Sequence, residues 1–165
     1  MPRTDAATVD PKLDLVLTRV VDVAPSLVWA AWTKPEHLKK WFTPAPWKTI
    51  EAELDLRPGG LFGVVMKGPE GQELRHVFCY LEIVPGERLV WTNMMAPGYR
   101  PSLARTADIP PFTAIVALEP SGSGTKYTAT VMHENPEDAR KHDEMGFRDG
   151  WGTALDQLVA MAKSM

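Results

Sequence analysis

The chain has a single cysteine, Cys79, among its 165 residues, so an internal disulfide cannot form. Cys79 lies in an alternating apolar stretch, where we expect a buried and reduced thiol. No stretch approaches the run of about 18 apolar residues that a membrane helix needs. Residues 1–12 also lack the apolar centre of a signal peptide. These absences predict a cytoplasmic protein with no membrane partner.

The chain also lacks an excess of positive charge. It has 18 Lys and Arg against 21 Asp and Glu, a net charge of -3, and no run of basic residues. Phosphate backbones are bound by clustered Lys and Arg, so we expect no nucleic acid partner.

Motifs for metal ions and for nucleophilic catalysis are missing as well. His133, His142 and Asp143 are possible metal donors within a short segment, but their spacing fits no strong signature such as HExxH or CxxC. No G-x-S-x-G elbow is present, and Cys79 has no base next to it in the sequence. We therefore predict no metal and no cofactor.

What the chain does have is the composition of one globular domain. Hydrophobic residues make up 44% and charged residues 24%, and 165 residues suffice for one core. No internal repeat or linker divides the sequence. We expect a flexible leader at residues 1–12 and a single domain at residues 13–165.

The first part of the domain predicts one strand followed by two short helices. Residues 13–23 are rich in Val and Leu and predict the strand. Residues 26–32 show helical spacing of apolar side chains. Thr33 and Glu36 have the spacing of a capping box, which would begin the second helix, and Pro44 would end it.

From residue 49 the apolar period changes from 3.6 to 2, which predicts strands. We expect them at residues 49–57, 61–67, 72–84, 87–95, 112–119 and 125–134. Glu51, Glu53 and Asp55 form a row of carboxylates on a polar strand face, where we expect them to be solvated. Residues 96–111 show no period and predict a long irregular loop. Its Arg100 and Arg105 could meet a ligand carboxylate, although loop arginines are more often solvated.

A long helix is expected at the end of the chain. Asn135 and Pro136 are a cap and a first helical residue. The helix has one apolar face, made of Phe147, Trp151, Leu155, Leu158, Val159 and Ala162. Gly146 and Gly150 weaken a helix, which indicates either close approach to the sheet or a break near Gly146.

Several local motifs resemble one family. They are APSLVW at 24–29, WTKPE at 32–36, RPGG at 57–60, EIVP at 82–85, RLVWT at 88–92, and Gly124-Thr125 with Gly150-Trp151. Together they are similar to the START-like (SRPBCC) superfamily. Within it they resemble the family of homologues of the activator of the heat-shock-protein-90 ATPase.

The resemblance implies an α+β helix-grip (START/Bet v 1-like) fold, in which a curved antiparallel sheet of six or seven strands wraps around the C-terminal helix. Members of the superfamily bind lipids, polyketides, plant hormones or other apolar molecules, and some are cyclases or hydrolases. The eukaryotic namesake is a co-chaperone with an additional N-terminal domain, for which we expect no room in this chain.

We predict an apolar cavity between the sheet and the last helix that binds a small hydrophobic ligand. The expected lining residues are Trp32, Phe62, His76, Phe78, Trp91, Phe112, His133, Phe147, Trp151 and Leu155. His76 and His133 are candidates for orienting the ligand or for proton transfer. A cyclase or dehydratase, a co-chaperone-like binding module and a homodimer remain open as alternatives.

Overall fold

The computed structural model describes residues 9–102 and 109–165. Arg105 and residues 1–8 of the predicted leader lie outside this range. The strands are β1 Asp14–Val21, β2 Lys48–Leu54, β3 Leu61–Lys67, β4 Glu73–Val84, β5 Arg88–Thr92, β6 Met95–Ala96, β7 Arg100–Pro101, β8 Thr113–Ser121 and β9 Gly124–Met132. The helices are α1 Pro25–Thr33, α2 Pro35–Trp41, α3 Pro136–Glu144 and α4 Phe147–Ala162.

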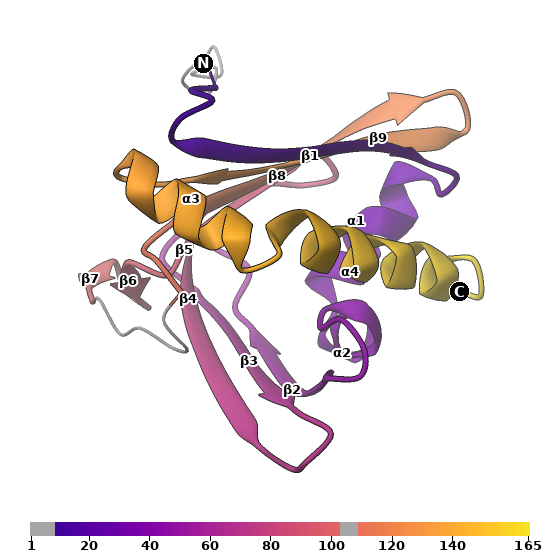
Figure 1. Ribbon diagram of the computed structural model, residues 1–165. Helices are drawn as coiled ribbons and strands as arrows, with labels where there is room; N and C mark the ends of the chain where they lie inside the picture. Colours follow the sequence, from indigo (N-terminus) through magenta and orange to yellow (C-terminus); the bar gives the residue numbers. More distant parts are fainter. Residues whose placement is uncertain (1–8, 103–108) are drawn as a thin grey trace.

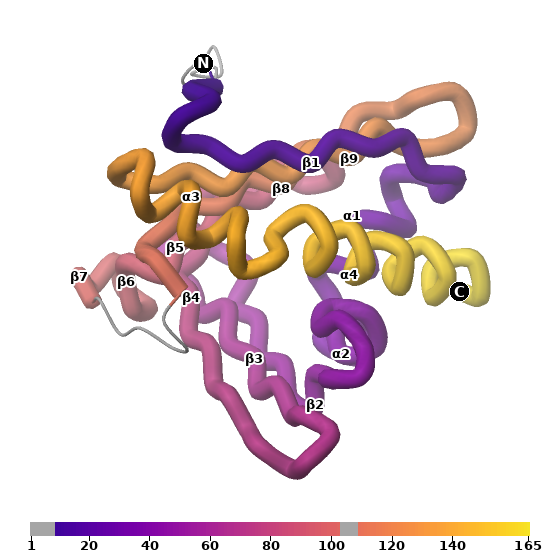
Figure 2. The backbone as a smooth tube through the Cα atoms, viewed as in Figure 1, coloured from indigo at the N-terminus to yellow at the C-terminus, as the bar shows by residue number. Residues whose placement is uncertain are grey.

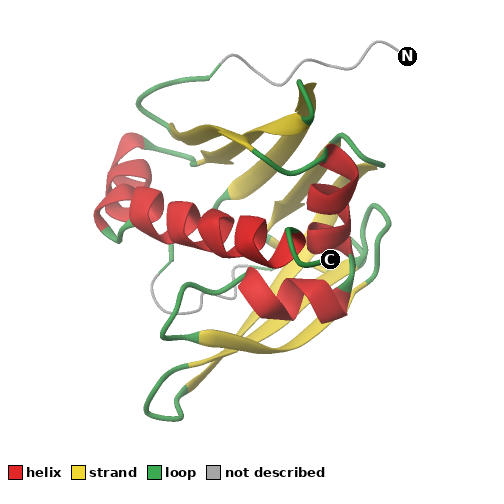
Figure 3. Cartoon of the chain, turned by 90° about the vertical axis from the view of Figure 1, so that its right-hand side faces the viewer, coloured by secondary structure: helices red, strands yellow, loops and turns green. Residues whose placement is uncertain are grey.

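The main sheet has seven antiparallel strands in the order β1-β9-β8-β5-β4-β3-β2. It curls around α4, which runs between the group of β1, β9 and β8 and the group of β2 and β3 (Figure 1). Helices α1 and α2 pack near the C-terminal end of α4 (Figure 3). This arrangement confirms the predicted α+β helix-grip fold.

The junction between α1 and α2 differs from the predicted capping box. Thr33 does not cap α2, because its Oγ1 donates to the carbonyl oxygen of Trp29 at 2.7 Å within α1. Lys34 occupies the N-cap position without a side-chain cap, and Pro35 follows at the first helical position. The indole N–H of Trp41 donates to the carbonyl oxygen of Ala31 at 3.0 Å, which fixes α2 against α1.

The C-terminal region consists of two helices with a bend between them (Figure 2). Asn135 caps α3, as predicted, because its side chain accepts from the Asp138 backbone N–H at 2.8 Å. Gly146 has φ 95°, a left-handed conformation that ends the first helical segment before α4 begins. The predicted C-terminal helix is therefore present as α4, and of the two alternatives drawn from its glycines the break near Gly146 is confirmed, because it separates α3 from α4.

The connection predicted as irregular at residues 96–111 contains regular structure. Met95–Ala96 and Arg100–Pro101 pair as a small antiparallel ladder. The end of the connection is fastened to β5: Asn93 Oδ1 accepts from the Phe112 backbone N–H at 2.9 Å, and Thr92 Oγ1 donates to the Phe112 carbonyl oxygen at 2.8 Å. These bonds place Phe112 next to the end of β5.

None of the helices in the described ranges is long and apolar enough to cross a membrane. Cys79 is buried and free, as its alternating surroundings predict.

Candidate ligand-binding cavity

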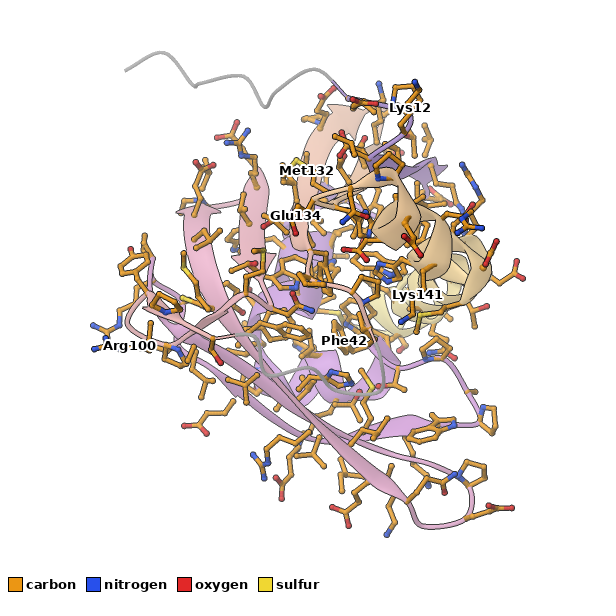
Figure 4. The ribbon with its side chains drawn as sticks, turned by 60° about the vertical axis from the view of Figure 1, so that its left-hand side comes forward. Lys12, Phe42, Arg100, Met132, Glu134 and Lys141 are labelled. Atoms are coloured by element: carbon orange, nitrogen blue, oxygen red, sulfur yellow. The ribbon has the colours of Figure 1, made fainter. Side chains whose placement is uncertain are left out.

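A cavity of about 430 Å³ lies between β4, the segment that follows α2, and the two C-terminal helices. Its wall is made of Trp32, Trp41, Phe42, Thr43, Pro44, Trp47, Met66, Leu74, His76, Val77, Phe78, Asn93, Ile109, Phe112, Tyr127, His142, Met145, Gly146, Phe147, Gly150, Trp151 and Ala154. Figure 4 shows Phe42 in the interior, between the C-terminal helices and the strands below them.

Six of the ten predicted lining residues lie in this wall. They are Trp32, His76, Phe78, Phe112, Phe147 and Trp151. They come from α1, β4, the residue before β8 and α4, which are far apart in the sequence. The alternation of β4 and the apolar face of α4 therefore direct these side chains into one space.

The structure places the other four, Phe62, Trp91, His133 and Leu155, behind the wall. Phe62, Trp91 and Leu155 are fully buried in the core. Phe62 packs on Phe78 with ring centroids 5.2 Å apart, and Trp91 stacks on Trp151 at 6.3 Å. These three side chains face the interior, as the apolar period of their strands and helix predicts. They do not reach the cavity, because wall residues lie between them and the open space.

The described wall contains no Lys, Arg, Asp or Glu side chain. Arg100 is exposed and projects away from the cavity (Figure 4). Glu51 and Glu53 are exposed on β2 and also lie outside the wall, while Asp55 is partly buried and pairs with Arg57 at 2.7 Å. The polar groups of the wall are thus neutral amides, hydroxyls and imidazoles.

His76 is the first of two buried histidines in the wall. Its ring stacks on Phe78 with centroids 5.8 Å apart and an interplanar angle of 8°. Burial lowers the pKa of His76, because the charged imidazolium loses its hydration there. No described residue forms a hydrogen bond with its ring. His76 therefore presents a neutral imidazole beside the aromatic wall.

His142, on α3, is the second. Its Nδ1 lies 2.9 Å from Nε2 of His133, and Nδ1 of His133 lies 2.9 Å from the carbonyl oxygen of Leu13. The His142 ring also packs against Phe112 and Phe147, with centroids 5.5 Å and 5.9 Å apart. Burial, assisted by the charge of His133 and opposed by Asp143, lowers the pKa of His142 to about 4.

Tyr127 is the third titratable residue of the wall. Burial raises the pKa of its phenol above the ordinary value, so the hydroxyl stays protonated and uncharged at pH 7. Thr43 is already bonded, because its hydroxyl oxygen lies 2.5 Å from that of Thr49. Both residues contribute polarity without charge.

Sequence reasoning missed several residues of this site. His142 was considered only as a metal donor, although its spacing from Ala139 puts it on the buried face of α3. Phe42, Trp47 and Met66 in the wall were not predicted either. Within residues 9–102 and 109–165, no group of three His, Cys, Asp or Glu side chains is placed to hold a metal ion.

Comparisons with known proteins agree with this architecture. The sequence profile of the family described as Activator of Hsp90 ATPase homolog 1-like protein matches residues 22–163. The search of the curated proteins returned no match.

Solved structures show the same fold. The crystal structure of a protein from Nitrosomonas europaea has a TM-score of 0.88 and 44% sequence identity, and the match covers 94% of this chain and 97% of that one. A Rhodobacter sphaeroides protein has a TM-score of 0.82 at 21% identity, covering 96% and 97% of the two chains. An Arthrobacter aurescens protein, solved by NMR, has a TM-score of 0.79 at 24% identity, covering 99% and 94%.

Proposed function

We propose, since this chain belongs to the Activator of Hsp90 ATPase homolog 1-like family, that it binds a small and largely apolar molecule in the cavity between its sheet and its C-terminal helices. The family and fold support ligand binding or a co-chaperone-like role in general terms. The observation that favours a ligand is the cavity of about 430 Å³ with aromatic walls and no charged side chain among its described residues.

The size and composition of the cavity suit a small organic guest. Cavities that bind such molecules have volumes of roughly 300–1,000 Å³ and are mostly apolar, with a few polar groups that set the orientation. Trp32, Phe112 and Trp151 offer rigid aromatic surface, which loses little conformational entropy when it contacts a ligand. Affinity would come mainly from burial of apolar surface.

Fluorescence of N-phenyl-1-naphthylamine, a neutral probe that brightens in apolar surroundings, tests this proposal. Ala154 lies in the wall, whereas Ala160 is exposed on the same helix. Ala154→Phe fills part of the cavity and should abolish the enhancement, whereas the matched control Ala160→Phe should keep it. If neither the probe nor any member of a panel of apolar compounds binds the wild-type protein, the proposal is wrong.

An enzyme of the cyclase or dehydratase type is a second candidate. It requires a perturbed titratable group at the cavity, and His76 and His142 meet that requirement. Binding remains our primary proposal, because a histidine with a pKa of about 4 is a weak base at neutral pH. Liquid chromatography with mass spectrometry of a co-purified molecule, before and after prolonged incubation, separates the two. An unchanged mass and retention time support binding, whereas loss of water, or a changed retention time at the same mass, supports catalysis.

A partner-binding module is less well supported. It predicts one exposed apolar patch. The large exposed apolar side chains of the described residues instead come from separate elements, among them Val20 on β1, Val77 on β4 and Met145 after α3.

A homodimer could form through an edge strand of the sheet, β1 or β2. Analytical ultracentrifugation tests this alternative, and a monomer at micromolar concentration would contradict it.

We also propose that the protein acts in a reducing compartment such as the cytoplasm. The buried free thiol of Cys79 supports this location. Fractionation of the native cells followed by immunoblotting would test it, and recovery of the protein outside the cytoplasm would contradict it.

A further inference from the structure

The carbonyl oxygen of Leu13 determines which ring nitrogen of His133 carries the proton. This oxygen can only accept hydrogen bonds, and it accepts one from the His133 backbone N–H at 3.0 Å. Nδ1 of the His133 ring lies 2.9 Å from the same oxygen. Nδ1 must therefore carry the hydrogen that makes this second bond.

The proton on His133 in turn fixes the tautomer of His142. A neutral imidazole has one N–H, so Nε2 of neutral His133 has a lone pair and must accept. Its partner at 2.9 Å is Nδ1 of His142, which therefore carries the hydrogen. Nε2 of neutral His142 is then left with a lone pair. The chain of two rings starts at a backbone oxygen and ends at an acceptor nitrogen.

This nitrogen is available to a guest molecule. His142 is part of the cavity wall and 8% exposed, and no described residue forms a hydrogen bond with its Nε2. Phe112 and Phe147 pack against the ring and hold it in place. An acceptor that lies in an apolar wall without a partner loses free energy unless a ligand donates to it.

We propose that the cavity selects neutral ligands that carry a hydroxyl or N–H group, which donates a hydrogen bond to Nε2 of His142. This inference rests on the proposed binding function and specifies its ligand class. An anionic ligand is disfavoured for two reasons: the described wall has no cationic side chain, and the lone pair of Nε2 would face the negative charge. An ether or a plain hydrocarbon would fit but would leave Nε2 unpaired.

Three probes of similar shape test the ligand class by calorimetry at neutral pH: 2-naphthol, 2-methoxynaphthalene and 2-naphthoate. A net hydrogen bond of ordinary strength corresponds to a preference of roughly 3- to 10-fold. We expect 2-naphthol to bind the wild-type protein that much more tightly than the ether, and 2-naphthoate to bind most weakly. His142→Phe should remove the preference for 2-naphthol and leave the affinity for 2-methoxynaphthalene within about 3-fold.

The outcomes separate this inference from the proposed function. Equal affinities of the naphthol and the ether would overturn the inference while leaving apolar binding intact. The same holds if 2-naphthoate binds most tightly. No binding by any of the three probes, together with no binding of N-phenyl-1-naphthylamine, would overturn both.

NMR spectroscopy tests directly whether His133 fixes the tautomer of His142, and it does so with or without a bound ligand. Long-range ¹⁵N–¹H correlation spectra should show the hydrogen of neutral His142 on Nδ1. In His133→Phe, the tautomer is no longer fixed, so the hydrogen should move toward Nε2 and the preference for 2-naphthol should fall. His37→Asn, a change outside the wall, is the control and should leave both unchanged. A wild-type spectrum with the hydrogen on Nε2 of His142 would refute the inference.

Discussion

Gln157 on α4 donates from its side-chain amide to the carbonyl oxygen of Trp41 at 2.9 Å. The same amide nitrogen lies 2.9 Å from the carbonyl oxygen of Thr43, and its Oε1 accepts from the Ala45 backbone N–H at 3.0 Å. One side chain thus holds the segment after α2 against α4. Because Thr43, Pro44 and Trp47 line the cavity, this contact positions part of the wall.

Gln157→Ala removes all three bonds, and we expect it to lower the free energy of unfolding by about 1–3 kcal/mol. Hydrogen exchange at the backbone amides of Ala45, Trp47 and Lys48 should accelerate, because the segment loses its attachment to α4. Thr153→Ala, an exposed change one turn earlier on the same helix, is the matched control and should alter neither quantity. Equal exchange rates in the two variants would contradict the assigned role of Gln157.

The buried histidines predict that the protein loses stability in mild acid. His142 has its pKa lowered to about 4, mainly by burial, and His76 is shifted in the same direction for the same reason. In the unfolded chain both titrate near 6.5, so below that pH the unfolded state binds more protons. The full stabilisation is present above about pH 6.5 and is lost as the pH falls toward 4.

Urea denaturation at pH 7 and pH 5 measures this effect. The His142 contribution amounts to about 3 kcal/mol once the pH has fallen through 4, and more than half of it is lost by pH 5. His142→Asn should therefore lose less stability between the two pH values than the wild type. An identical loss in both proteins would show that His142 is not responsible.

We expect substitution by alanine to change the stability of the protein differently at two glycines of α4, Gly150 and Gly152. A methyl group at Gly150 would meet no atom within 4 Å, so Gly150→Ala should stabilise the protein by about 0.5–1 kcal/mol through helix propensity. A methyl group at Gly152 would lie 2.8 Å from Nη2 of Arg19, whose Nη1 pairs with Asp156. Gly152→Ala should therefore gain less or lose stability. Thermal unfolding of both variants measures the two changes in stability. A larger gain in stability for Gly152→Ala than for Gly150→Ala would contradict the close contact between Gly152 and Arg19.

The turn between β2 and β3 requires Gly60. A methyl group there would collide with the carbonyl oxygen of Asp55, while the Gly60 backbone bonds to Arg57 and Tyr80 at 2.8 Å and 2.9 Å. We expect Gly60→Ala to lower the free energy of unfolding by at least about 2 kcal/mol. Gly63→Ala on β3 is the control, because the atoms nearest to its methyl group would belong to the flexible Leu61 side chain, at 3.3 Å or more. Similar chemical denaturation midpoints for the two variants would argue against this assignment.

The periodicity of the sequence predicts the strands and helices, because each side chain that packs in the core must point to one side of its element. Strand Leu61–Lys67 has the predicted bounds, and the other main strands differ by a few residues at their ends. The capping box failed for a local reason. The Thr33 hydroxyl had a competing acceptor in the preceding turn of α1, which spacing alone does not reveal.

The cavity was harder to predict than the fold, because its polar contacts join distant parts of the chain. His133 meets Leu13 across 120 residues, and Gln157 meets Trp41 across 116. The period correctly predicts that Phe62 and Trp91 face the interior. Which aromatic surface is left uncovered depends on how neighbouring rings from other elements pack on them. No local pattern contains that information.

The position of β1 in the sheet has a consequence for biosynthesis. Its one neighbour in the main sheet is β9, and Val21 pairs with Thr125, more than 100 residues later. Ribosomes add about 5–20 residues per second, so a nascent β1 waits roughly 5–20 s before its partner has been translated. During that interval its backbone N–H and C=O groups have no strand to pair with. The pairing of β1 with β9 must therefore wait for the middle of the chain, and slow translation of that segment prolongs the aggregation-prone stage.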